Sequence, residues 1–358
     1  MHNSAHKRPA QPARGRDPGS IGQLDLPTPY LLFLGDVADA GYAKTAFGLR
    51  DWAPERCVGE YALPGATVSA GLPRLSPTEA VAQGARALVI GIANTGGVLS
   101  PGWIPALLEA LDAGLDVISG MHNRLGDHPL LRERAERLGR RLIDVRRPPA
   151  GIPIATGLKR GGKRLLTVGT DCALGKKYTA LAIARALDAR GVDADFRATG
   201  QTGIMIAGGG VPMDAVVADF AAGAAELLSP DADPDHWYVI EGQGSILHPA
   251  YSGVSLALLH GSQPDVIVVS HDVSRTMLLG HEPFPMPSVE EVIALTIQLG
   301  RRVNPAIRCG GVTINTAALD AQTAEALLDR EAKRLDLPVA DPIRGGTRFD
   351  RLIDACLG

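Results

Sequence analysis

The sequence predicts an α/β protein built from two domains, each with a parallel β-sheet. Along most of the 358 residues, short apolar runs that end at glycine alternate with helical patterns. This alternation is typical of parallel strands joined through helices. A proline-rich break at 146–153 separates two such series, and consecutive prolines cannot continue a helix. A loop with glycines and two lysines, at 169–177, opens the second series.

Composition and charge exclude several classes of function. A formal net charge of −3 argues against a general binder of nucleic acids or membrane surfaces, because both partners are anionic. The cysteines Cys57, Cys172, Cys309 and Cys356 form no CxxC pair, so neither a metal site nor a disulfide framework is indicated. We expect a cytoplasmic homo-oligomer without membrane spans that acts on a small molecule.

The first domain is expected over residues 28–146, after a disordered tail over 1–27 that is rich in Pro, Arg, Gly and Ala. Its predicted strands lie at 30–35, 86–91, 116–120 and 141–145, with helices at about 103–113 and 130–138. This order is Rossmann-like, but there is no GxGxxG fingerprint, so we assign no dinucleotide. Ligands of open parallel sheets bind beyond the carboxyl ends of the strands. Asn94 and Thr95 are therefore candidate substrate contacts, although the glycines beside them equally fit plain turns.

A linker over 147–162 leads to the second domain, expected over 163–358. An apolar strand at 165–169 leads into the lysine loop and a helix at 175–190. Further strands are predicted at 196–199, 237–241, 265–271, 310–315 and 338–340, with helices at 212–228, 289–299, 320–335 and 348–357. The most apolar strand, 265–271, is expected at the centre of the sheet.

Strand, glycine loop, lysine and helix in this order predict a phosphate-binding loop, or P-loop. Gly169 lies six positions before Gly175, one residue more than in the common GxxxxGK[ST] pattern, and Lys177 stands where a hydroxyl would bind Mg²⁺. Thr179 is a poor geometric substitute for that hydroxyl. The loop is thus expected to hold a phosphate without hydrolysing it, through a set of candidate cofactor-binding residues: Gly169, Thr170, Asp171, Cys172, Ala173, Gly175, Lys176, Lys177, Tyr178 and Thr179.

Polar residues after neighbouring strands supply the catalytic candidates. Glu241 ends its strand at the place of a Walker-B acid, where it could bind a metal-bound water or, without metal, act as a general base. It equally fits a structural carboxylate that caps a helix or forms a salt bridge. His271 directly follows the central strand and ranks above the other loop histidines, His248 and His281. Two further polar residues, Gln201 and Thr202, are candidate contacts for a substrate carboxylate.

The strings GTDCALGKKYTAL, GQTGIMI, IEGQGSILHP and VVSHD carry a family resemblance. The loop is similar to the GTDxxxGKT of dethiobiotin synthetase. From about residue 29 to the end, the chain resembles the DgcN-like D-amino-acid N-acetyltransferases. That resemblance implies acetyl transfer from acetyl-CoA to a D-amino acid such as D-glutamate, in D-amino-acid degradation, with no metal.

On this reading the P-loop holds CoA phosphates and Glu241 is the base, with loop amides near 242–244 as donors to the oxyanion. One alternative is an ATP-dependent kinase or ligase of a small carboxylate, against which Lys177 speaks. Another is a non-catalytic sensor of CoA or nucleotides.

Overall fold

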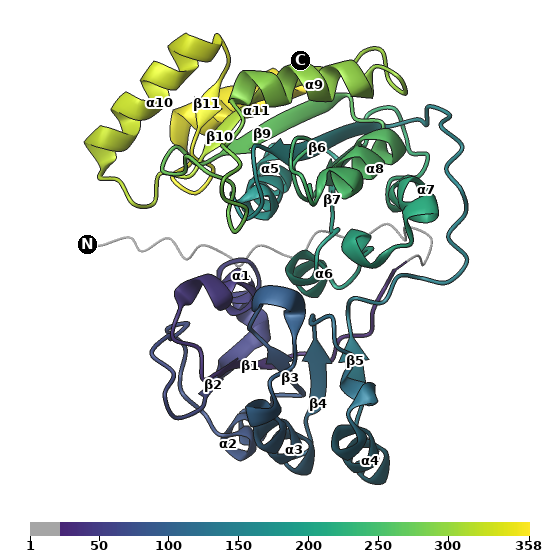
Figure 1. Cartoon of the computed structure of the whole chain (residues 1–358), viewed down its shortest axis with the longest axis vertical. Helices are drawn as coiled ribbons and strands as arrows, with labels where there is room; N and C mark the ends of the chain where they lie inside the picture. The colour runs from purple at the N-terminus through teal and green to yellow at the C-terminus, as the bar shows by residue number, and fades with distance from the viewer. Residues whose placement is uncertain (1–21) are drawn as a thin grey trace, which may run out of the picture.

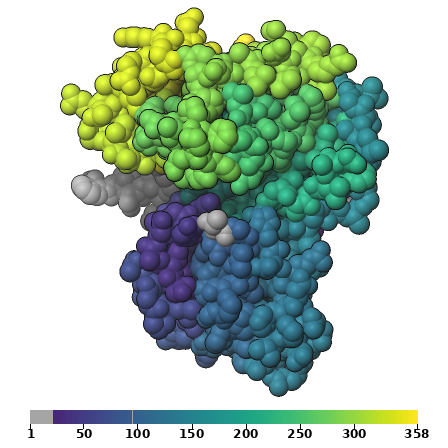
Figure 2. Space-filling view, viewed as in Figure 1, coloured from purple at the N-terminus to yellow at the C-terminus, as the bar shows by residue number. Residues whose placement is uncertain are grey.

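The computed structural model describes residues 22–358, which form two domains, each with a parallel β-sheet. The domains lie one above the other in the view of Figures 1 and 2. The tail expected at 1–27 falls mostly outside the described residues. Its last part, 22–27, contacts the second domain: Gln23 forms a β-bridge with Gly209, and the Leu24 amide donates to the Gly208 carbonyl at 3.1 Å. None of the described helices combines the length and apolar character that a membrane span requires.

The N-terminal sheet has the order β2-β1-β3-β4-β5, with every pair parallel. Its strands are β1 (Tyr30–Gly35), β2 (Cys57–Ala62), β3 (Ala87–Ile90), β4 (Asp116–Ser119) and β5 (Leu142–Asp144). Its helices are α1 (Lys44–Trp52), α2 (Pro77–Ala82), α3 (Ile104–Asp112) and α4 (Pro129–Leu138). The sequence pattern does not reveal β2, because Gly59 and the buried Glu60 interrupt its apolar run.

The two faces of this sheet are covered by helices from different domains. Leu31 and Phe33 of β1 point into a core shared with α3 and α4. Leu32 and Leu34 point to the other face, where they pack with Leu49 of α1 and with residues of α6 (Gln201–Ala207), a helix of the second domain. Figure 1 shows α6 between the domains, above the carboxyl ends of the strands. The two domains therefore share one hydrophobic core.

The C-terminal sheet has the order β11-β10-β9-β6-β8-β7 and is also parallel. Its strands are β6 (Lys163–Gly169), β7 (Ala194–Arg197), β8 (Trp237–Ile240), β9 (Val266–His271), β10 (Arg308–Ile314) and β11 (Val339–Ala340). One face is covered by α5 (Lys176–Ala189) and α11 (Gly346–Leu357). The other packs against α7 (Ala218–Leu228), α8 (Ser252–Ser262), α9 (Val289–Gly300) and α10 (Ala321–Leu335). β6 lies at the centre, where the strand order reverses and α/β proteins bind ligands.

The helix predicted over 212–228 is shorter than expected. A single 3-10 turn, Met213–Ala215, precedes α7, and Val216 and Val217 between them have extended backbone angles. Val217, expected on the inner face, is 66% exposed.

The segment between β5 and β6 is bound to the second domain along its second half (Figure 1). The amides of Thr156 and Gly157 donate to Glu226 of α7, each at 2.9 Å. The guanidinium of Arg164, fully buried, donates to carbonyls that include those of Gly161 and Pro230. These bonds fix where β6, and hence the P-loop after it, begins.

Candidate functional site

The loop after β6 has the geometry of an anion cradle. Ala173 and Gly175 take positive φ values of 53° and 99°, which turn the chain sharply before α5. Within the described residues, the amides of Ala173, Leu174 and Gly175 donate to no protein acceptor. Unpaired amides beside a helix N-terminus attract an anion. The structure thus forms the loop that the sequence predicts between Gly169 and Lys177.

Hydrogen bonds within the loop and from the segment after β9 hold it in this shape. Arg275, in the segment after β9, donates to the carbonyls of Cys172 at 3.0 Å and Ala173 at 3.2 Å. Lys176 Nζ donates to the Asp171 carbonyl at 2.6 Å, and the Asp171 carboxylate accepts from the Leu279 amide at 2.9 Å. The loop is therefore preorganised by the protein.

Lys177 extends from the loop to the N-terminal domain. A Cβ built on Gly48 of α1 would lie 2.7 Å from Lys177 Nζ and 2.6 Å from Thr202 Cγ2. Glycine at position 48 therefore leaves room for the Lys177 side chain between α1 and α6. Among the described residues Nζ has no hydrogen-bond acceptor, and it lies 5.2 Å from the centre of the Tyr178 ring. Although part of the residue remains exposed, burial of the ammonium lowers the pKa of Lys177 to about 8, against the attraction of Glu241. An ammonium without a partner beside an anion cradle is suited to a ligand.

The three hydroxyl-bearing candidates of the loop have partners in the protein. Thr170 Oγ1 lies 2.9 Å from His271 Nδ1. The Tyr178 hydroxyl donates to Asp51 of α1 at 2.6 Å. Thr179 Oγ1 lies 3.0 Å from Thr313 Oγ1 and 3.3 Å from Ser270 Oγ, inside the sheet. The Thr179 hydroxyl is thus turned away from the place where a Mg²⁺ ligand would be needed.

Glu241 follows β8 and is buried under the first turn of α6. Its Oε2 accepts from the amides of Thr199 at 3.0 Å and Gly200 at 3.1 Å. Burial raises the pKa of Glu241, opposed by Lys177, by these two amides and by Lys176. The carboxylate therefore orders the start of α6 and lies directly beside the P-loop lysines.

The substrate-contact candidates are divided between two places. Thr202 Oγ1 lies 3.0 Å from Thr45 Oγ1 of α1, and Gln201 is beside Gly120, where a Cβ would lie 1.6 Å from Gln201 Oε1. That oxygen is buried and has no hydrogen-bond donor among the described residues. Asn94 instead pairs with both backbone groups of Val98, at 2.9 and 3.0 Å, within its own loop. The side chain of Thr95 lies outside the described part of the chain.

A second histidine, His248, also lies beside the loop. Asp171, Cys172 and His248 bring potential metal-binding atoms within 4.8 Å of one another. The Ala250 amide donates to His248 Nδ1 at 3.1 Å, so the proton of the neutral ring is on Nε2, facing Asp171 Oδ1 at 3.6 Å. Metal binding at Nε2 would leave the ring without either proton. The donor set therefore does not fit a metal.

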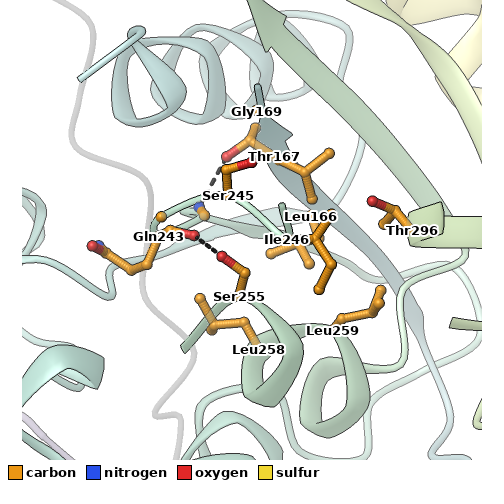
Figure 3. Close-up of a pocket in the computed structure, with 13 residues that line it drawn as sticks. Leu166, Thr167, Gly169, Gln243, Ser245, Ile246, Ser255, Leu258, Leu259 and Thr296 are labelled. Carbon is orange, nitrogen blue, oxygen red and sulfur yellow. Dashed lines mark hydrogen bonds between the residues drawn. The ribbon is translucent and has the colours of Figure 1, made fainter. Parts of the chain in front are cut away.

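A small cavity lies on the opposite side of β6 from α5 (Figure 3). Its volume is about 10 Å³, and Ser245 and Thr296, which line it, have hydroxyls without a hydrogen-bond partner among the described residues. Ser255 donates to the Gln243 carbonyl at 2.7 Å and closes another part of the wall. A void of this size admits about one water molecule and no substrate.

Comparison with known proteins agrees with this architecture. Residues 153–352 match a domain of unknown function described as the DUF1611_C P-loop domain, and 55–148 match the DUF1611_N Rossmann-like domain. A crystal structure of a DUF1611 family protein from Anabaena variabilis is 32% identical, with a TM-score of 0.80 over 92% of this chain and 99% of that one. The predicted pair of Rossmann-like and P-loop domains is confirmed.

Two curated relatives are named D-glutamate N-acetyltransferase. One, from Tritonibacter scottomollicae, is 50% identical over 330 residues, covering 92% of this chain and 98% of the relative. The other, from a Pseudoalteromonas species, is 45% identical over 323 residues, covering 90% and 97%. The matched domains, the relatives and the solved structure together show that the chain belongs to the DUF1611 family, alongside the D-glutamate N-acetyltransferases that its sequence resembles.

Proposed function

We propose that this protein N-acetylates D-glutamate, with acetyl-CoA as the donor, as a step in D-amino-acid breakdown. The observation that carries the proposal is the P-loop itself. Lys177 replaces the metal-binding hydroxyl, and the Thr179 hydroxyl points into the sheet. A cradle with two lysines and no metal-binding hydroxyl holds a phosphate without activating it for transfer. The relatives named D-glutamate N-acetyltransferase support the acceptor.

The reaction needs a neutral amine and a polarised thioester. A base takes one proton from the substrate ammonium, and the amine nitrogen then attacks the acetyl carbonyl carbon. A C–N bond forms, the C–S bond breaks and the CoA thiolate leaves. The second nitrogen proton, released as the amide forms, neutralises that thiolate. Donors aimed at the carbonyl oxygen stabilise the intermediate between these steps.

The sequence suggests that the P-loop holds the CoA phosphates and that Glu241 is the base, but the geometry makes these two roles hard to combine. If the P-loop holds the phosphates of CoA, the long pantetheine arm carries the thioester away from the loop. Glu241, however, lies beside the P-loop lysines and binds the amides of Thr199 and Gly200. We therefore place the phosphates at the loop and assign to Glu241 the positioning of α6.

The variant Glu241→Gln tests that assignment, because glutamine keeps an oxygen for the two amides. We expect it to retain at least about a tenth of kcat. A base contributes roughly 100-fold or more to the rate, so a loss of that size with an unchanged KM for acetyl-CoA would make Glu241 the base.

Thiol release from acetyl-CoA, measured over a panel of D- and L-amino acids, tests the function directly. We expect D-glutamate to give the highest kcat/KM. Isothermal titration with CoA, and with ATP with and without Mg²⁺, tests the ligand of the P-loop. Tight binding of Mg-ATP without binding of CoA, together with no thiol release, would favour the kinase or ligase alternative.

A further inference from the structure

A second cationic site lies between the domains, at the carboxyl ends of β4 and β5. An open pocket of about 370 Å³ is lined there by Met121, His122, Arg124, Asp144, Arg146 and Arg147. Its volume is in the range of small-molecule sites. The pocket contains no part of the P-loop, and the candidate site residues lie outside its lining.

Of the three arginines that line the pocket, two form ion pairs with acidic residues and one does not. Arg146 pairs with Asp214 of the second domain, and Arg147 pairs with Asp144 at 3.3 Å. Arg124 has no ion pair or hydrogen bond from its guanidinium among the described residues. Glutamate carries two carboxylates and one ammonium, a net charge of −1, which matches this excess. The phosphates of CoA would bring several negative charges to a site that has one unpaired positive charge.

The pocket is connected to the site already described through α6. Arg146 Nε donates to the Gly120 carbonyl at 2.5 Å, and Gly120 is the residue against which Gln201 lies. Lys177 approaches the same turn at the next residue, Thr202. The P-loop and the arginine pocket thus both meet the first turn of α6. A CoA held at the loop by its phosphates extends its thioester away from the loop, and the pocket lies at the same turn.

We propose that this pocket binds the acidic amino acid, with Arg124 and Arg147 holding its carboxylates, an assignment that rests on the proposed function for the identity of the acceptor. Arginine binds carboxylates through paired hydrogen bonds, and the unpaired Arg124 is free to do so.

The test compares Arg124→Met with Arg137→Met, a control at an exposed arginine on α4. Within residues 22–358 the Arg124 side chain makes no hydrogen bond or ion pair, so its variant is expected to fold normally. In steady-state assays we expect Arg124→Met to raise the KM for D-glutamate about tenfold or more, the loss expected for a charge-assisted hydrogen bond, with the KM for acetyl-CoA within about twofold of wild type. The control should match wild type in both constants.

Titration with glutarate measures the pocket without acetyl transfer. Glutarate has both carboxylates and no amine, and we expect its binding to weaken in Arg124→Met and to persist in Arg137→Met. If glutarate binding depends on Arg124 but the protein acetylates no amino acid, the pocket is a dicarboxylate site and the proposed function is rejected. Intact acetylation with a raised KM for acetyl-CoA and an unchanged KM for D-glutamate would assign the pocket to CoA phosphates and overturn the proposal. Unchanged constants and unchanged glutarate binding in Arg124→Met would overturn it as well.

Discussion

Replacing Lys177 with methionine should stabilise the protein without ligand and weaken its binding of CoA. Burial lowers the pKa of the Lys177 ammonium to about 8 from an ordinary value of 10.5. The folded state therefore holds this charge at a cost of up to about 3 kcal/mol below pH 8, less where solvent reaches the residue. Because the unfolded chain binds more protons between pH 8 and 10.5, the stability of the wild type rises across that window as the cost disappears. Methionine fills the same space without a charge, and Glu241 keeps its two amide donors.

The assay is urea unfolding of wild type and Lys177→Met at pH 7 and pH 10, with Lys333→Met, at an exposed lysine of α10, as control. We expect Lys177→Met to be about 2–3 kcal/mol more stable at pH 7 and the difference to shrink towards zero at pH 10. Its affinity for acetyl-CoA should fall about tenfold or more. A variant less stable than wild type by the same amount at both pH values would refute the reasoning, since the effect of Lys177 on stability would then not depend on its charge.

Three further outcomes follow from contacts of the site. Gly48→Ala brings a Cβ within 2.6 Å of Thr202 Cγ2, and should lower the free energy of unfolding by about 1–3 kcal/mol, while Gly126→Ala, in open space, should not. Arg164→Met removes the hydrogen bonds from a fully buried guanidinium to carbonyls that include those of Gly161 and Pro230, and should cost about 3 kcal/mol or more, seen as a lower urea midpoint. Burial raises the pKa of the Cys172 thiol, so it should react with iodoacetamide more slowly than a free thiol, and CoA should slow it further; labelling unaffected by CoA would place CoA elsewhere.

The parallel sheets and the P-loop could be predicted because their signals are local. An apolar run, a glycine exit and a following helix lie within some twenty residues of sequence, as from Lys163 to Thr179. β2 could not be predicted in this way, since its buried Glu60 depends on partners outside the strand: Ser69 Oγ and the Ala70 amide donate to it at 2.7 and 2.6 Å, and Arg74 pairs with it at 3.5 Å. Such a strand depends on partners that the local pattern does not contain.

The candidate site, too, depends on contacts that the local sequence pattern does not contain. The sequence identifies Lys177 as a departure from the usual pattern, but only the fold places its ammonium against Gly48 of another domain. The roles of Glu241, His271 and the remaining candidates stay predictions. The arginine pocket had a weaker signal, a loop after the third predicted strand, and its charge balance depends on Asp214, far along the chain.

On the proposed function, the shared core explains how one protein can hold two anionic substrates. CoA and glutamate repel each other, yet the amine of one must reach the thioester of the other. The two cation clusters, Lys176 with Lys177 and the pocket of Arg124, meet the first turn of α6 at neighbouring residues: Lys177 at Thr202, and the pocket, through Gly120, at Gln201. Because α6 is packed into the core of the N-terminal domain while its chain belongs to the second, the spacing of the clusters is set by buried contacts of both domains. The negative ends are thereby kept apart, and the reacting ends can meet along this helix.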